Sequence, residues 1–174
     1  SQSNSPDGPN VEKGAQAYML RSIPTADRKM LTCTSDTCPT TLGSSSKLDP
    51  FAATNGAILS KDANRTTLID WARGLDNKGD ERGTADKPVT STTAMRPSVH
   101  GDVVHSRPVA LNYGNDTSPQ VVVFYGGNDG ALHAVAGNRT APASSNARAG
   151  SELWSFMPPG FHSRIQRLDD NSVR

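Results

Sequence analysis

The stretch that most constrains the fold is Gln120–Gly137, which reads QVVVFYGGNDGALHAVAG. Its first part, Val121–Tyr125, is an unbroken run of β-branched and aromatic residues, which predicts one fully buried strand. The next five residues, GGNDG, tolerate positive φ, as a tight reversal between strands requires. Alternating apolar residues then predict a second strand. We therefore expect a β-hairpin, and because an isolated hairpin is only marginally stable in water, further strands must surround it.

Two more segments predict strands of the same sheet. Gly101–Leu111 contains two short runs of β-forming residues interrupted at Pro108, which suits a sheet edge or a bulge. Ser151–Met157 alternates between two faces in the way that a strand requires. We expect the C-terminal half of the chain to be antiparallel β.

Helical patterns are short and lie outside this region. Val11–Arg21 predicts one helix, and Asp62–Gly74 predicts another, with Asp62 or Asn64 as the candidate N-cap and Gly74 after the last turn. A third helix can begin in Phe161–Leu168. The rest of the N-terminal half predicts loops.

The composition indicates a loop-rich chain with little material for a core. Of the 174 residues, 34% are hydrophobic and 5% aromatic, with 15 glycines and 12 prolines. A net charge of +1 provides no field that would favour nucleic acid or an anionic membrane. No apolar run approaches the roughly 20 residues that span a bilayer. We expect no nucleic-acid partner and no membrane span.

The two cysteines, Cys33 and Cys38, lie in a loop rich in threonine and serine. A zinc site needs about four ligands, and no second Cys/His pair with suitable spacing follows. A redox motif would have two intervening residues rather than the four found here. The pair therefore predicts a local disulfide, with two free thiols as the alternative, and a disulfide implies an oxidising, extracytoplasmic compartment.

The motifs of the chain follow one another in an order that resembles a known family. HGDVVHSRPV (100–109), GGNDGALHA (126–134) and GSELWSF (150–156) are preceded by RKMLTC (28–33), LDPF (48–51) and LIDWARGLD (68–76). From Val11 to Phe161 the chain is similar to the C-terminal propeller of the PilC/PilY-type family of type IV pilus tip adhesins and biogenesis proteins. The strand, turn and Gly-x-Glu-Leu-Trp pattern also resembles the blade unit of quinoprotein-type β-propellers.

The resemblance implies a mainly β fold: an incomplete, quinoprotein-like β-propeller of about one to one and a half blades, where closure takes typically four to eight. Residues 1–10 would be a linker, 11–98 a loop-rich pre-propeller segment with two short helices, and 99–174 the first blade region. The implied protein is a non-enzymatic component of the type IV pilus machinery in Gram-negative bacteria, secreted to the pilus tip or cell surface. It would support pilus biogenesis, adhesion and twitching motility. Its expected partners are the remainder of the propeller, minor pilins and a host-cell surface receptor.

Many members of that family carry a calcium loop, so the resemblance also implies calcium in the parent protein. The nearest segment here, DNKGDE at 76–81, lacks the Asp-x-Asp-x-Asp-Gly spacing and has Lys78 at a ligand position. Asp76, Asp80 and Glu81 are the candidate calcium ligands, and a solvated acidic loop is the alternative.

The histidines and neighbouring polar residues predict structure rather than catalysis. His100 and His105 are five residues apart, so on a strand they would point to opposite faces and share no metal. Asp102, His105 and Ser106 are sequence neighbours and would not converge as a catalytic triad does. We expect instead that His105–Arg107 holds a blade edge through hydrogen bonds. The hairpin should contain a packed His133 and turn-forming Asn128 and Asp129.

The propeller pattern raises one alternative function, a fragment of a quinone-dependent dehydrogenase. Such an enzyme needs many blades around its cofactor and a tryptophan that stacks on the quinone ring. The chain has two tryptophans, Trp71 and Trp154, and both are expected in the core. We therefore predict that the chain is not an enzyme and that this segment binds no cofactor.

Overall fold

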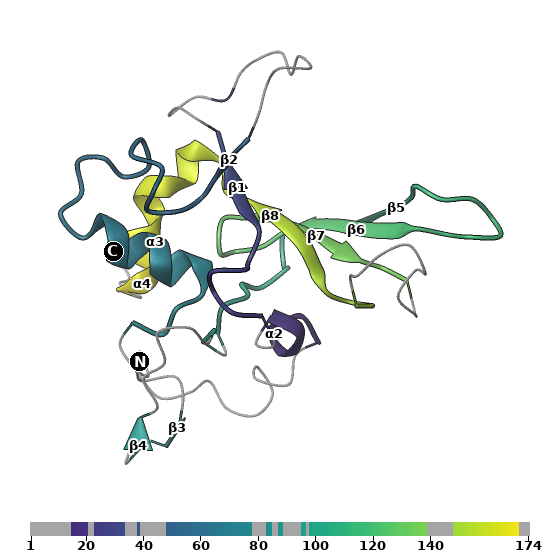
Figure 1. Cartoon of the computed structure of the whole chain (residues 1–174), viewed down its shortest axis with the longest axis horizontal. Helices are drawn as coiled ribbons and strands as arrows, with labels where there is room; N and C mark the ends of the chain where they lie inside the picture. Colours follow the sequence, from purple (N-terminus) through teal and green to yellow (C-terminus); the bar gives the residue numbers. More distant parts are fainter. Residues whose placement is uncertain are drawn as a thin grey trace.

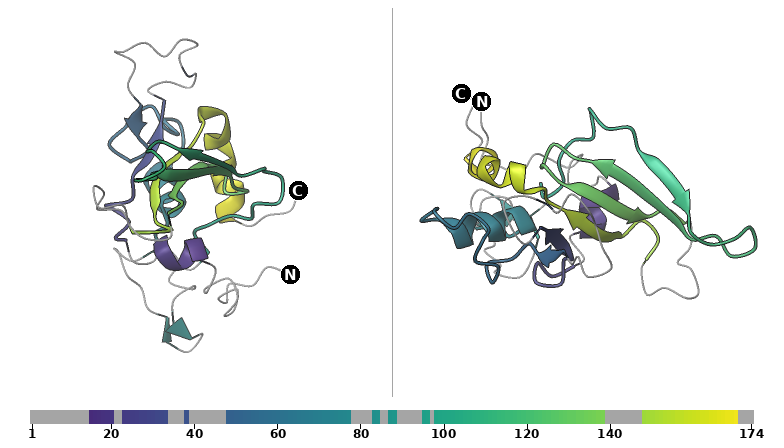
Figure 2. Two further views of the ribbon diagram at one scale, coloured as in Figure 1. Left: turned by 90° about the vertical axis from the view of Figure 1, so that its right-hand side faces the viewer. Right: turned by 90° about the horizontal axis from the view of Figure 1, so that it is seen from above.

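A computed structural model of the chain describes residues 15–20, 23–33, 38, 48–77, 83–84, 87–88, 95–96, 98–138 and 148–170 (Figure 1). The fold is mainly β, with a six-stranded mixed sheet and a few short helices. Helices α3 and α4 lie side by side at one end of the sheet, and the β5–β6 hairpin extends away from them at the other end (Figures 1 and 2). In the described part of the chain this sheet does not close on itself.

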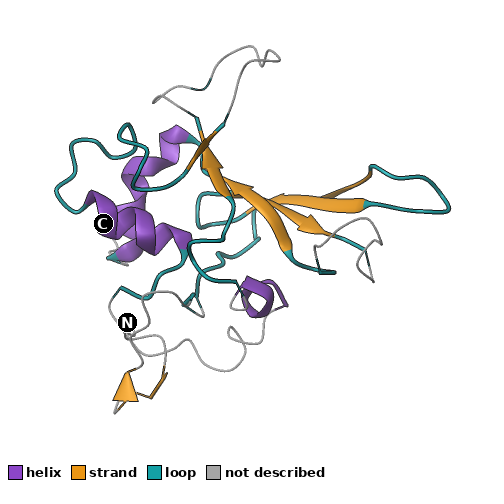
Figure 3. Ribbon diagram, in the orientation of Figure 1, coloured by secondary structure: helices purple, strands orange, loops and turns teal. Residues whose placement is uncertain are grey.

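The strand order of the main sheet is β2-β1-β8-β7-β6-β5, as labelled in Figure 1; Figure 3 shows the strands in orange. Its strands are β1 (Met30–Thr32), β2 (Asp49–Pro50), β5 (Val109–Asn112), β6 (Val121–Gly126), β7 (Leu132–Ala136) and β8 (Glu152–Phe156). A separate pair consists of β3 (Gly83–Thr84) and β4 (Lys87–Pro88).

Strands β5 to β8 form a four-stranded antiparallel meander, in which each strand pairs with the next along the chain. This confirms the expected hairpin, the strand in Ser151–Met157 and the antiparallel C-terminal half. Strand β1 then adds to the far edge of the meander and runs parallel to β8, with Met30 opposite Ser155. A strand from the N-terminal half therefore completes the sheet and makes it mixed.

Two expectations about the strands were wrong. The first arm of the hairpin, β6, is half-buried along its whole length, because its neighbour β5 is exposed; the buried arm is β7. The first of the two runs in Gly101–Leu111 forms no strand, and only Val109–Asn112 pairs with β6. The backbone before Pro108 instead lies against the hairpin turn, where the Asn128 N–H donates to the Asp102 carbonyl at 2.9 Å.

Each predicted helical segment contains a helix: α2 (Ala15–Leu20), α3 (Arg65–Arg73) and, in the tail, the 3-10 helix η1 (Pro159–Arg164) followed by α4 (Ile165–Asp169). Asn64 occupies the N-cap position of α3, although its side chain makes no capping hydrogen bond. Gly74 ends the helix with a φ of 114°, in the left-handed region that favours glycine.

The main core joins the N-terminal half of the chain to the sheet and the C-terminal helix. Its buried members are Met30, Phe51, Ile58, Leu68, Ile69, Ala131, Met157 and Ile165. A smaller cluster contains Leu20, Met95 and Val99. Both clusters include residues from each side of the boundary expected near residue 99, so the two predicted segments pack against each other.

The predicted disulfide between Cys33 and Cys38 is present, immediately after β1. On the chain-entropy account, closing so short a loop stabilises the fold by about 2 kcal/mol. A disulfide is consistent with an extracytoplasmic location. Within the described residues, no helix has the length and apolar character needed to cross a membrane.

Candidate functional site

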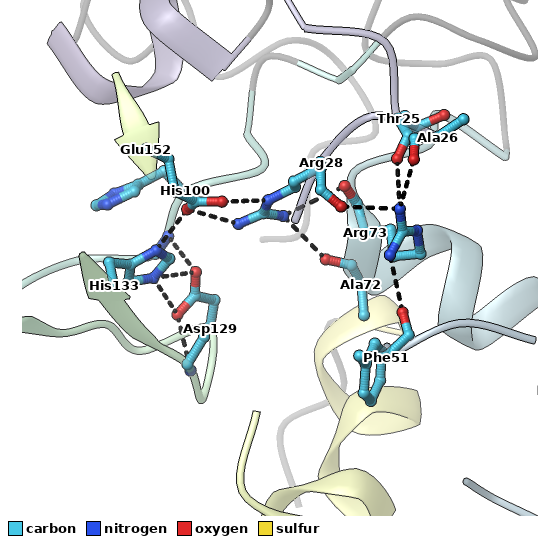
Figure 4. A network of polar contacts seen from close by, with 12 residues as sticks. Thr25, Ala26, Arg28, Phe51, Ala72, Arg73, His100, Asp129, His133 and Glu152 are labelled. Atoms are coloured by element: carbon cyan, nitrogen blue, oxygen red, sulfur yellow. Dashed lines mark hydrogen bonds and ion pairs between the residues drawn. The ribbon is translucent and has the colours of Figure 1, made fainter. Parts of the chain in front are cut away.

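The site is a network of buried charges centred on Glu152, at the start of β8 (Figure 4). Arg28 donates from Nε to Glu152 Oε1 at 2.8 Å and from Nη2 to Oε2 at 3.1 Å. His133 on β7 donates from Nδ1 to the same Oε2 at 2.8 Å. The side chains of Arg28 and Glu152 are each only 2% exposed. One carboxylate therefore pairs with two groups from distant parts of the chain.

His133 is held between two carboxylates. Its Nε2 lies 3.0 Å from Asp129 Oδ2, while its Nδ1 faces Glu152, and the side chain is fully buried. Because ionised carboxylates only accept hydrogen bonds, both ring nitrogens must donate, so His133 is an imidazolium cation. Burial alone would lower the pKa of His133, but the hydrogen bonds to Asp129 and Glu152 outweigh it and raise the pKa to about 9.

Both carboxylates are ionised at neutral pH. Burial would raise the pKa of Glu152, but the charge of Arg28 and the hydrogen bond from His133 dominate and lower it to about 2. The pKa of Asp129 is also lowered, because the hydrogen bonds and charge of His133 and the Ala131 N–H overcome its burial. The network thus contains two cations and two anions that compensate one another.

A break in the strand register brings Glu152 to this site. Ala134 pairs with Trp154, so regular pairing would place Leu153 opposite Val135; instead Glu152 occupies that position. Partners across a ladder share a face, and Val135 shares a face with His133, so the shift turns the carboxylate towards the imidazole. Without this irregularity the Glu152 side chain would lie on the opposite face of the sheet.

Asp129 is placed by the tight turn between β6 and β7. Its Oδ1 accepts a hydrogen bond from the Ala131 N–H at 3.1 Å, and Gly130 follows with a φ of 84°. This confirms Asp129 as a turn former and shows that it also pairs with His133. The turn and the network share one side chain.

Two arginines connect the network to helix α3. Arg28 Nη1 donates to the Ala72 and Arg73 carbonyls at 3.3 and 3.2 Å, at the negative end of the helix dipole. Arg73 in turn donates to the carbonyls of Thr25, Ala26, Arg28 and Phe51. The backbone of residues 25–28, helix α3 and the sheet are therefore held together by buried guanidinium groups.

Two further rings pack against His133. The Tyr125 ring stacks on it with centroids 5.2 Å apart, and the His100 ring lies 4.9 Å away. His100 Nε2 and the Tyr125 hydroxyl are hydrogen-bonded at 2.8 Å. Burial and the nearby positive charge of His133 lower the pKa of His100, although Asp129 and Glu152 oppose this shift. His100 and His133 are thus adjacent rings with opposite pKa shifts.

The predicted site residues have different outcomes. His133 is packed, as expected, but its ion pairs were not predicted. His100 is part of the cluster, whereas His105 is exposed. In the described residues no hydrogen bond joins Asp102, His105 and Ser106, so no triad forms. Ser106 Oγ instead accepts from the Gly126 N–H at 2.9 Å, in agreement with a role in holding the sheet edge.

Calcium binding stays a prediction. Asp76 is buried, but Asp80 and Glu81 lie outside the described residues. Among the residues that the structure describes, no group of three or more His, Cys, Asp and Glu side chains could hold a metal ion. The two tryptophans have protein partners: the Arg96 guanidinium lies 3.8 Å from the Trp71 ring centroid, and the Trp154 ring centroid is 5.9 Å from that of Phe124.

Arg28 and Glu152 were not among the site residues predicted from the sequence. A signal for each exists: Glu152 is a lone charge at the start of an apolar strand, and Arg28 precedes the buried run of β1. Charged residues are rarely fully buried unless they are paired, so each in such a context indicates a partner. Neither position reveals which partner it has.

Comparisons of the chain with protein-family models, curated proteins and solved structures found no match. The function must therefore be argued from the geometry and the motifs. Both nitrogens of His133 are occupied by carboxylates and its side chain is fully buried, so no donor or acceptor remains for a substrate. The arrangement favours a role in holding segments together.

The ionised His133 predicts that stability falls in mild alkali. Its pKa is raised from 6.5 to about 9 on folding, so its stabilisation is complete below pH 6.5 and is lost as the pH rises through about 9. We expect the free energy of unfolding to decrease by about 3 kcal/mol over this range. Urea unfolding at several pH values would measure it, with the variant His133→Gln as the reference. Equal pH dependence in both proteins would contradict the ionised state.

Proposed function

We propose that the chain is the opening part of an incomplete β-propeller, with residues 99–174 as its first blade region. The protein would be of the PilC/PilY type, a non-enzymatic component of the type IV pilus machinery. The observation that carries this proposal is the convergence of the resembling motifs on one network. Arg28 belongs to RKMLTC, His100 to HGDVVHSRPV, Asp129 and His133 to GGNDGALHA, and Glu152 to GSELWSF. Segments that are far apart in sequence thus supply contacting side chains, as expected if the motifs define one structural unit.

The meander supports the same proposal. Propeller blades are four-stranded sheets, and β5 to β8 form four consecutive antiparallel strands. The register places Val109 opposite Phe124, and Phe124 opposite Ala134, which itself faces Trp154. These four residues therefore lie on one apolar face of the meander. On this face the side chains of Val109 and Leu111 are 52% and 46% exposed. In a propeller, the neighbouring blade would cover such a face.

The proposed location is extracytoplasmic, at the pilus tip or the cell surface, and it is supported by the disulfide between Cys33 and Cys38. The proposed task is interaction: a rigid propeller presents its loops to minor pilins and to a host-cell receptor. The remaining blades come from the same or a companion chain. Together these contacts would support pilus assembly, adhesion and twitching motility.

The test is genetic and uses two matched substitutions on β5. Deleting the gene in its own bacterium should reduce the number of surface pili, counted by electron microscopy, and the twitching zone. Complementation with Leu111→Glu should fail, because a charge on the apolar face prevents a second sheet from packing there. Ala110→Glu, which is exposed on the opposite face, should complement fully.

The stability of the isolated chain shows whether Leu111→Glu fails because a contact is lost or because the chain misfolds. Because Leu111 and Ala110 are both exposed, neither substitution should change the free energy of unfolding by more than about 0.5 kcal/mol. Unchanged pilus number and motility after deletion would reject the pilus function. Full complementation by Leu111→Glu would reject the covered face.

A further inference from the structure

Residues 100–107, which we name the latch segment, follow the buried Val99 and lie across the turn between β6 and β7 without forming a strand. The Asn128 N–H donates to the Asp102 carbonyl at 2.9 Å, and the Gly126 N–H donates to Ser106 Oγ at 2.9 Å. The side chain of His100 also reaches the Tyr125 hydroxyl, and the Gly101 N–H donates a long hydrogen bond to Asp129 Oδ2 at 3.5 Å. The segment is thus held by a few separate bonds rather than by a continuous ladder.

The surroundings of His100 contain four charges that are already paired. Tyr125 on β6 and His133 on β7 contact its ring. Besides His133, three charged groups act on His100: Asp129 in the turn, Glu152 on β8 and Arg28 before β1.

The oxygens of both carboxylates already accept hydrogen bonds. Those of Glu152 accept from Arg28 and His133, and those of Asp129 accept from His133 and the Ala131 N–H. A positive charge on His100 would therefore meet the imidazolium of His133, at a ring distance of 4.9 Å, without a carboxylate of its own.

We propose that His100 is an acid-operated latch, which holds residues 100–107 on the hairpin turn at neutral pH and releases them in mild acid while the sheet stays folded. After the intervening Pro108, strand β5 begins at Val109, so release also frees the connection to the exposed edge strand. The inference rests on the ring cluster and its charges, and it does not depend on the proposed pilus function.

The pH dependence of attachment follows because proton binding to His100 is linked to detachment of the latch segment. Burial and the charge of His133 lower the pKa of His100 in the attached state below its ordinary 6.5. The released segment therefore binds the proton more tightly than the attached segment does. Attachment is strongest above pH 6.5 and weakens as the pH falls below that value.

Amide hydrogen exchange on the full chain tests the latch. The Asn128 and Gly126 amides report attachment, and the Ala136 amide, bonded to the Ser151 carbonyl, reports the sheet. After correction for intrinsic exchange, we expect the protection of Asn128 and Gly126 to fall by about threefold or more between pH 7.5 and pH 5.5. Ala136 should keep its protection over the same range.

Two variants identify the titrating group. His100→Gln keeps a side chain that can hydrogen-bond Tyr125 but cannot take up a proton, so its Asn128 amide should show no acid loss of protection. His105→Gln removes the exposed histidine of the same segment and should behave as wild type. An equal acid loss in His100→Gln would overturn the proposal, and so would an equal loss at Ala136, because the whole sheet would then open.

A measurement on the wild-type chain removes any dependence on how the variants fold. Titration of the His100 ring protons by nuclear magnetic resonance should give a midpoint below the ordinary value for histidine. It should coincide with the midpoint for loss of Asn128 protection. A midpoint at or above the ordinary value, or an unchanged Asn128 amide across the titration, would overturn the latch.

Discussion

Replacing Glu152 with glutamine is expected to lower the free energy of unfolding by about 4 kcal/mol. The substitution keeps the shape of the side chain but removes the negative charge shared by Arg28 and His133. Because Arg28 and Glu152 are almost fully buried, water cannot replace the lost partner. Guanidinium unfolding at neutral pH, followed by circular dichroism, would measure the change.

Two comparisons make this result specific. Asp116→Asn removes an exposed carboxylate from the β5–β6 loop and should change stability by less than about 0.5 kcal/mol. Arg28→Met combined with Glu152→Gln should cost less than the sum of the single substitutions, because the double variant no longer buries an unpaired guanidinium. A cost for Glu152→Gln as small as that of Asp116→Asn would show that the network does not stabilise the fold.

Gly101→Ala is the second substitution with a large expected effect. A Cβ atom at this position would lie 2.3 Å from the Asp129 backbone nitrogen and 3.0 Å from the Asn128 carbonyl carbon. Both neighbours are main-chain atoms, so either the latch segment or the turn that carries Asp129 has to move. We expect a loss of about 3 kcal/mol in urea unfolding.

Gly56→Ala is the matched control for this substitution. A Cβ at Gly56 meets no atom within 4 Å, and its backbone does not require positive φ. Alanine there should leave stability unchanged or raise it by about 0.5 kcal/mol, through the lower entropy of the unfolded chain. If both glycine substitutions had the same effect, close packing at Gly101 would not be the cause.

The elements that local pattern decides could be predicted from the sequence. The run before GGNDG predicted the hairpin, and the alternation in Ser151–Met157 predicted the fourth strand of the meander. Gly74 marked the end of a helix. The pairing of β1 with β8 could not be predicted, because a three-residue strand has no pattern that names a distant parallel neighbour. The burial of β6 was misjudged because composition does not tell how much of a strand its neighbours cover.

The candidate site was predictable only in part. Turn chemistry identified Asp129, and the alternation along β7 indicated that His133 was packed. Glu152 could not be placed, since its orientation depends on a one-residue register shift that regular alternation would not produce. Arg28 could not be assigned for a related reason: its partner lies in the opposite half of the chain.

The parallel pairing of β1 with β8 also sets an order of assembly. The meander can close through short connections, but β1 can pair only after β8 exists, and the loop between them spans most of the described chain. A chain made from its N-terminus therefore presents Arg28 and Met30 long before Glu152 and Met157 arrive. The β1 segment thus waits for its sheet partner after it has emerged, and until then it is open to chaperones and proteases.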